Sequence, residues 1–168
     1  MWLFTDPALG GADLERVVAR LPRGLCGVVF RHDGVAGRAS LLRRLAAVCR
    51  ARNILLVSAG AGAVPRGVGR HLRGGRGRRG GTVLVTSSAH GRAELVRARR
   101  AGAALAFLSP VLPTASHPGA PALGVVRWAG LARGAGLPVF ALGGMTGLSA
   151  RHLPRWVAGV GAIRSLLP

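Results

Sequence analysis

Lysine and tyrosine are absent from this sequence, and acidic residues are scarce. All 24 lysine-plus-arginine positions are arginines and face only five acids, so the formal net charge is +19. Lysine is also a common phosphate ligand, so a surface selected for binding anions would retain some of it. Its complete absence favours a compositional bias of the genome. A functional basic field for anionic ligands or nucleic acid stays the alternative.

Cysteine, aromatic residues and long apolar runs are also in short supply. Cys26 and Cys49 show no metal-site spacing and are too few for a disulfide framework, which predicts buried, reduced thiols. Aromatic residues make up 4% and hydrophobic residues 49% of the chain, so we expect an aliphatic core. No apolar run approaches the roughly 20 residues of a membrane helix, and the N-terminus lacks the basic start of a signal peptide. We therefore expect a soluble, cytoplasmic protein without a membrane partner.

The chain does contain a regular alternation of short apolar runs and helix-like stretches, and its 168 residues predict one domain, residues 1–168. The runs are continuous, which is typical of parallel strands covered on both faces and predicts an α/β fold. Strands are expected at residues 2–5, 27–31, 54–58, 82–88, 104–109, 138–144 and 158–163. Helices are expected around residues 14–21, around residues 41–49 with Ser40 as N-cap, and at residues 91–101 and 124–133.

The number of strands leaves two architectures open. An eighth strand at residues 67–72 would close a (β/α)8 barrel, although such barrels typically need about 250 residues. Residues 59–81 have room for little helix, and no final helix follows residue 163. An open, doubly wound sheet is the alternative.

One low-complexity segment, RHLRGGRGRRGG, occupies residues 70–81. It resembles arginine–glycine tracts that bind RNA, but it has no aromatic residue on which a base could stack. We expect a solvated, flexible connector, with RNA association as the alternative.

Ligands of parallel α/β sheets bind at the carboxyl ends of the strands. Gly143 and Gly144 end the penultimate strand, where glycine lets a ligand approach the backbone and leaves amide groups for a phosphate. Ser88 and His90 are two residues apart and would point the same way, with helix capping as the alternative role. Further candidates at strand ends are Asp6, Arg31, Ser109, Thr114, Ser116, His117 and Gly161.

Several of these segments together resemble a known family. They are VVFRHDG (28–34), SSAHGRAEL (87–95), SPVLPT (109–114), SHPGAPALG (116–124), LPVFALGGM (137–145) and AGVGAI (158–163). In this combination they resemble the thiamine phosphate synthase family, which includes the thiazole tautomerases. The resemblance implies a compact (β/α)8 TIM-type barrel with residues 67–72 as the fourth strand, short helices after strands 3 and 4, and the last helix missing.

The resemblance also implies an activity and roles for residues. The family's synthases join a pyrimidine diphosphate to a thiazole phosphate, with magnesium neutralising the leaving diphosphate. Gly143 and Gly144 would hold the thiazole phosphate, and Arg31 would contact the diphosphate. The other substrate-binding positions implied are Ser88, Ser109, Thr114, Ser116 and Gly161.

The expected magnesium ligands are replaced. Ser58 and Ala59 stand where the family has an Asn-Asp pair, and residues 73–81 contain no acid where it has a further aspartate. A hard divalent cation prefers carboxylate oxygens, and only Asp6 and Asp33 are near the rim. We therefore expect no metal site. Magnesium would be a cofactor only if synthase activity is retained.

The tautomerase branch needs no metal and works by proton transfer, for which His90 and His117 are chemically suited, with Ser88 beside them. The prediction is a thiamine biosynthesis protein that binds thiazole phosphate. It is either a synthase-type transferase or a metal-independent tautomerase. A non-catalytic regulatory relative and an RNA-associating protein are the alternatives. The expected partners are a phosphorylated thiazole and a pyrimidine diphosphate, nucleic acid is not expected, and an oligomer stays open.

Overall fold

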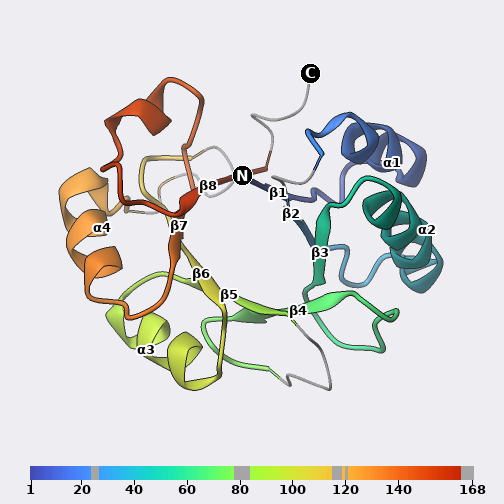
Figure 1. Ribbon diagram of the computed structural model, residues 1–168, viewed down its shortest axis with the longest axis horizontal. Coiled ribbons are helices and arrows are strands. Elements are labelled where there is room, and N and C mark those ends of the chain that lie inside the picture. The colour runs from blue at the N-terminus through green and yellow to red at the C-terminus, as the bar shows by residue number, and fades with distance from the viewer. Residues whose placement is uncertain (24–26, 78–83, 115–118, 120, 164–168) are drawn as a thin grey trace.

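A computed structural model describes residues 1–23, 27–77, 84–114, 119 and 121–163. Its eight parallel strands pair in sequence order, and β8 pairs with β1 to close the barrel (Figure 1). The strands are β1 (Trp2–Phe4), β2 (Gly27–Phe30), β3 (Leu55–Ser58), β4 (Gly69–Arg73), β5 (Val85–Ala89), β6 (Leu105–Leu108), β7 (Val139–Ala141) and β8 (Gly159–Ala162). The closed barrel and the fourth strand are confirmed, and the open-sheet alternative is wrong.

The ring of helices around the barrel is incomplete. Two helices cover β1–β3 and two cover β5–β7, while the connection from β3 to β4 contains none (Figure 1). The helices are α1 (Gly11–Arg20), α2 (Arg38–Ala51), α3 (Arg92–Arg100), α4 (Gly124–Arg133) and the 3₁₀ turn η1 (Ser149–His152). The sequence predicts that no helix follows the last strand. Residues 164–168, on which this expectation depends, lie outside the described residues.

The core has two layers of different composition. Between barrel and helices it is mostly aliphatic, with Leu14, Leu42 and Leu45 buried beside β1–β3, although Trp128 of α4 is also fully buried there. Inside the barrel it is aromatic, because Phe107 packs edge-on against Phe4, with ring centroids 4.7 Å apart. The expected aliphatic core is therefore wrong for the interior, where few but large rings fill the space between eight strands.

Two local expectations are also wrong. Helix α2 begins at Arg38 and is preceded by Gly37, whose φ of 72° places it in the left-handed region, so Ser40 lies inside the helix and is not its N-cap. The connector expected at residues 70–81 begins as strand β4, in which His71 and Leu72 are buried. Its residues 78–81 lie outside the described residues.

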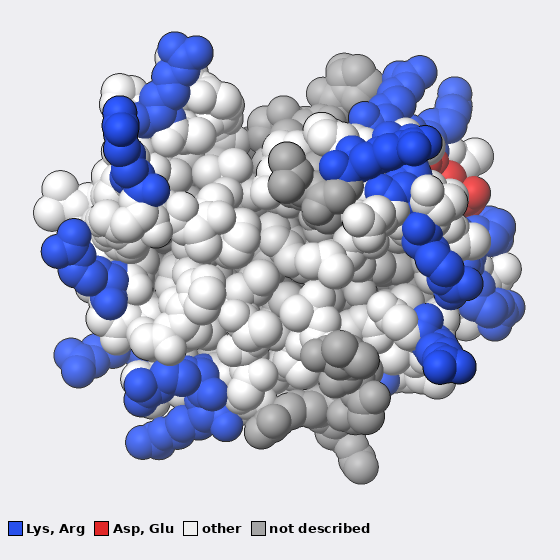
Figure 2. Space-filling model, in the orientation of Figure 1, with Lys and Arg blue, Asp and Glu red and all other residues white. Residues whose placement is uncertain are grey.

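Three further features of the described chain are its thiol, its lack of a membrane-spanning helix and the spread of its surface arginines (Figure 2). Cys49 is a buried free thiol whose pKa burial raises to about 12, whereas Cys26 lies outside the described residues. In the described part of the chain, no helix is long and apolar enough to cross a membrane. Arginines in Figure 2 are spread around the circumference of the visible face and do not gather in one patch.

Candidate functional site

A cavity of about 960 Å³ opens at the carboxyl ends of the barrel strands. It brings together residues from strands far apart in the sequence, which is how parallel barrels build ligand sites. The predicted site residues that line it are Arg31, Ser88, His90, Ser109, Thr114, Gly143, Gly144 and Gly161. The predicted residues Ser116 and His117 lie outside the described residues.

The turn after β7 forms one end of this cavity. Gly143 and Gly144 both have positive φ, 89° and 68°, a conformation that favours glycine. A Cβ on Gly144 would lie 2.7 Å from the carbonyl oxygen of Pro113, so the loop after β6 packs directly on this turn. The Leu112 N–H donates to the Gly143 carbonyl at 3.1 Å, which fixes the turn. The N–H groups of Gly143 and Gly144 have no acceptor among the described residues, so they are available to an anion.

His90 lies directly after β5, in the cavity wall. Its Nδ1 is 2.9 Å from the carbonyl oxygen of Ser109. Because a carbonyl oxygen only accepts hydrogen bonds, Nδ1 carries the proton and Nε2 of the neutral ring keeps its lone pair. The His90 backbone N–H donates to the Glu94 carboxylate at 2.8 Å. The Glu94 side chain therefore accepts the hydrogen bond at the start of α3. No side chain of residues 88–90 caps this helix, so the capping alternative is wrong.

Arg31 and Arg73 line the opposite side of the cavity, at the ends of β2 and β4. The Arg31 Nε donates to the Thr5 carbonyl at 3.1 Å, and its guanidinium stacks 5.5 Å from the Phe4 ring centroid. Burial lowers the pKa of Arg31, and Asp6 opposes this effect. Sequence reasoning missed Arg73 because it was assigned to a connector. Its position one residue after the expected fourth strand was the signal that could have found it.

His71, also missed, lies in the cavity floor. Its Nδ1 is 2.8 Å from the Thr86 hydroxyl oxygen, and the residue is buried. Burial, together with the charges of Arg31 and Arg73, lowers its pKa to about 3. His71 is therefore a neutral floor residue and an unsuitable proton carrier near neutral pH.

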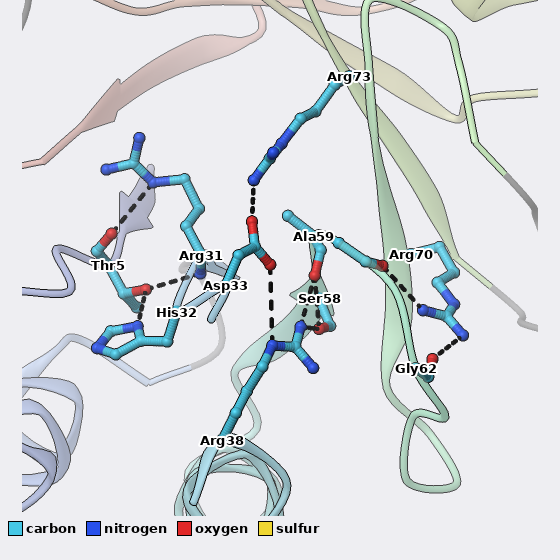
Figure 3. A network of polar contacts seen from close by, with 11 residues as sticks. Thr5, Arg31, His32, Asp33, Arg38, Ser58, Ala59, Gly62, Arg70 and Arg73 are labelled. Carbon is cyan, nitrogen blue, oxygen red and sulfur yellow. Dashed lines mark hydrogen bonds and ion pairs between the residues drawn. The ribbon is translucent and has the colours of Figure 1, made fainter. Parts of the chain in front are cut away.

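Oxygen atoms at the ends of β2 and β3 contact Arg38, as Figure 3 shows. The Arg38 guanidinium donates to the Ser58 hydroxyl at 2.8 Å and to the Ala59 carbonyl at 2.6 Å. Its Nε is 3.8 Å from an oxygen of Asp33, which also pairs with Arg73. No group of three or more His, Cys, Asp or Glu residues in the described ranges could hold a metal ion. The residues present therefore do not fit the magnesium ion that the family resemblance implies.

The fold and the cavity define a small TIM-type barrel protein with its ligand site at the carboxyl ends of the strands. Residues 73–165, more than half of the chain, match the family TMP-TENI, thiamine monophosphate synthase. The chain belongs to this family, and so to the proteins of thiamine biosynthesis.

A solved structure supports the same fold. Thiamine phosphate pyrophosphorylase from Pyrococcus furiosus matches with a TM-score of 0.78 at 18% identity, over 96% of this chain and 84% of that chain. At this identity the likeness shows the barrel alone. No curated protein sequence gives a significant match.

Proposed function

We propose that the chain binds a thiazole phosphate in this cavity and catalyses a metal-independent isomerisation of its ring. The observation that carries the proposal is one shared cavity, in which His90 presents the Nε2 lone pair and the Gly143–Gly144 turn presents unpaired N–H groups. A phosphate on the turn would place the attached ring toward β5 and β6. Isomerisation moves a proton from one atom of that ring to another, so it needs a base and no co-reactant.

The residues of the chain divide this work among them. Backbone N–H groups would hold the phosphate, because they are fixed by the packed turn and need no charge of their own. His90 would take a proton at Nε2 and return it, while the Ser109 carbonyl keeps Nδ1 protonated. Ser88 and Thr114 line the same cavity and offer hydroxyl groups to the polar atoms of the ring.

A synthase reaction is the second candidate, and the family membership favours it. It requires a cation that neutralises a leaving diphosphate, a role that a carboxylate-held magnesium ion fills. Here the Ser58 hydroxyl and the Ala59 carbonyl oxygen already accept hydrogen bonds from Arg38. A loss of about 4 kcal/mol of leaving-group stabilisation would slow the reaction roughly a thousandfold. We therefore expect weak or no magnesium-dependent synthesis.

RNA association receives less support. Arg70 of the tract is engaged with the Gly62 carbonyl. The arginines in the visible face are also dispersed (Figure 2). A non-catalytic relative would bind the thiazole phosphate without turnover, so the assay below separates it from an isomerase.

The experiment compares both reactions with purified protein in magnesium and in chelator. We expect isomerisation of thiazole phosphate at equal rates in both, and a loss of about 10²–10⁴-fold in His90→Ala because the base is removed. His152→Ala removes an exposed histidine of η1 and is the matched control, with unchanged rate expected. Robust synthesis that disappears in chelator, or full isomerisation by His90→Ala, would overturn the proposal.

A further inference from the structure

Arg38 is a cation enclosed by oxygen atoms of the protein. Its side chain is 16% exposed, and it donates to the Ser58 hydroxyl and the Ala59 carbonyl. The face of the guanidinium lies 5.2 Å from the Phe30 ring centroid, which adds a cation–π contact. Three protein groups thus contribute oxygens around one fixed positive charge, since the Asp33 carboxylate completes the set.

Asp33 lies between Arg38 and Arg73 and contacts both (Figure 3). One of its carboxylate oxygens faces Arg38 and the other pairs with Arg73, whose side chain is largely exposed and lines the cavity. A long, exposed arginine on its own would lose conformational entropy on binding a ligand. Because Asp33 already restricts the Arg73 side chain in the free protein, less conformational entropy is lost when a ligand binds.

Arg31 completes a pair of guanidinium groups on this side. Its Nε is used by the Thr5 carbonyl, while its terminal amino groups have no acceptor in the described part of the chain. Arg31 and Arg73 each lower the pKa of His71, so both charges act on the same part of the cavity floor. Planar guanidinium groups bind phosphate oxygens in bidentate fashion, which suits an anion with several oxygens.

The order of strands separates this pair from the glycine turn. In the closed barrel, β3 lies four strands from β7, so the ends of β2–β4 face the ends of β6–β8 across the cavity. The cavity therefore has two poles that attract anions, one made of backbone N–H groups and one made of guanidinium groups.

We propose that Arg38 is a built-in cation that replaces a metal ion, and that Arg31 and Arg73 hold the phosphate groups of a diphosphate with no divalent cation. The proposal goes beyond the proposed function, because isomerisation of a thiazole phosphate needs no diphosphate, and the two share only the cavity. It makes Arg38 a positioning residue, since Arg38 acts through Asp33 and Arg73 and does not line the cavity.

The first test is calorimetry with inorganic pyrophosphate in chelator and in magnesium. We expect binding in chelator with an affinity at least equal to that in magnesium, because magnesium bound to pyrophosphate would meet two guanidinium charges. Binding that requires magnesium would overturn the proposal. So would the absence of any binding.

The second test separates the arginine pair from general charge attraction. Arg73→Gln removes one guanidinium of the pair and should weaken pyrophosphate binding at least about tenfold, as expected for charge-assisted hydrogen bonds. Arg100→Gln removes the same charge from the exposed end of α3 and should stay within about twofold. Equal losses in both variants would show only a diffuse basic field and would overturn the proposal.

The third test concerns Arg38. Arg38→Ala should weaken pyrophosphate binding, and guanidinium chloride at a non-denaturing concentration should restore it by filling the vacated space. Sodium chloride at the same ionic strength should not restore it, and guanidinium should not rescue Arg73→Gln to the same degree. A merely structural role for Arg38 predicts no rescue of binding by guanidinium, and that result would contradict the proposal.

These outcomes are distinguishable from failure of the proposed function. Pyrophosphate binding in chelator without thiazole phosphate binding would leave the arginine pole standing and remove the isomerase. Thiazole phosphate binding without pyrophosphate binding would do the reverse.

Discussion

The two poles of the cavity differ in how they attract an anion. The turn after β7 uses backbone N–H groups held by glycine conformation and by close packing of the loop after β6. The ends of β2–β4 use side-chain charge, organised by Arg38 and Asp33. The family match, residues 73–165, includes the first pole and leaves out all of the second except Arg73. The family match thus covers the turn after β7 and most of its surroundings, whereas the residues that organise the charged pole lie outside it.

The largest expected effect is at the backbone-built pole. Gly144→Asp introduces a side chain at a φ of 68°, 2.7 Å from neighbouring atoms of the loop, and adds a negative charge beside the free N–H groups. We expect affinity for thiazole phosphate to fall at least about 100-fold and the free energy of unfolding to fall by about 2–4 kcal/mol. Calorimetry and denaturant unfolding measure the two effects.

The control for this variant is Gly147→Asp. It adds the same charge three residues away, where a Cβ meets no atom within 4 Å and φ is ordinary. It should change binding by no more than about threefold. If both variants bind equally well, the turn is not the phosphate pole.

The next largest effect concerns His71 in the cavity floor, whose pKa is lowered by burial and by the charges of Arg31 and Arg73. The pKa of His71 is lowered from 6.5 to about 3 in the folded protein. Between these two pKa values the unfolded chain binds a proton at His71 and the folded protein does not. The contribution of neutral His71 to the free energy of unfolding is therefore complete above about pH 6.5 and is lost as pH falls toward 3. One such group costs about 2 kcal/mol between pH 7 and pH 5.

His71→Gln should remove this part of the acid sensitivity while keeping a partner for Thr86. Urea unfolding of both proteins across this pH range measures the difference. Parallel pH profiles for the two proteins would show that His71 is not held neutral by the floor and the arginines above it.

The smallest expected effect concerns Glu94, an acid in the first turn of α3. Glu94 lines the cavity, accepts from the His90 N–H and pairs with Arg97 at 3.4 Å. Glu94→Gln keeps an acceptor for the N–H but removes a negative charge from the start of α3. Stability should fall by about 0.5–1 kcal/mol, and anion binding should strengthen about twofold to fivefold. Weaker anion binding would contradict the assignment of Glu94 as a charge opposing the ligand.

Much of the fold could be predicted from continuous apolar runs, because parallel barrel strands are buried on both faces. Strand β4, which carries His71 and Arg73, was expected at residues 67–72 as the eighth strand that would close a barrel, and the family resemblance implied the same. Composition was a poorer guide, since only a few aromatic side chains, Trp2, Phe4, Phe107 and Phe140, are large enough to fill much of the barrel interior. Ser40 failed as an N-cap because Gly37, in a left-handed conformation, ends the preceding turn earlier.

The site could be predicted where it depends on strand ends and not where it depends on long side chains. Gly143, Ser88 and His90 follow directly from the ends of β7 and β5. Arg38 could not be found in this way, because it lies on α2 and reaches the end of β3 only through the packing of the helix on the barrel. The same limit applies to Asp33, whose two partners come from different elements.

The most direct test of the account is calorimetry of the intact protein with thiazole phosphate, in chelator and in magnesium. We predict saturable binding of one ligand per chain with the same affinity in both conditions, because backbone N–H groups of the turn after β7 hold the phosphate without a metal ion. Binding that appears only with magnesium, or no binding in either condition, would contradict it.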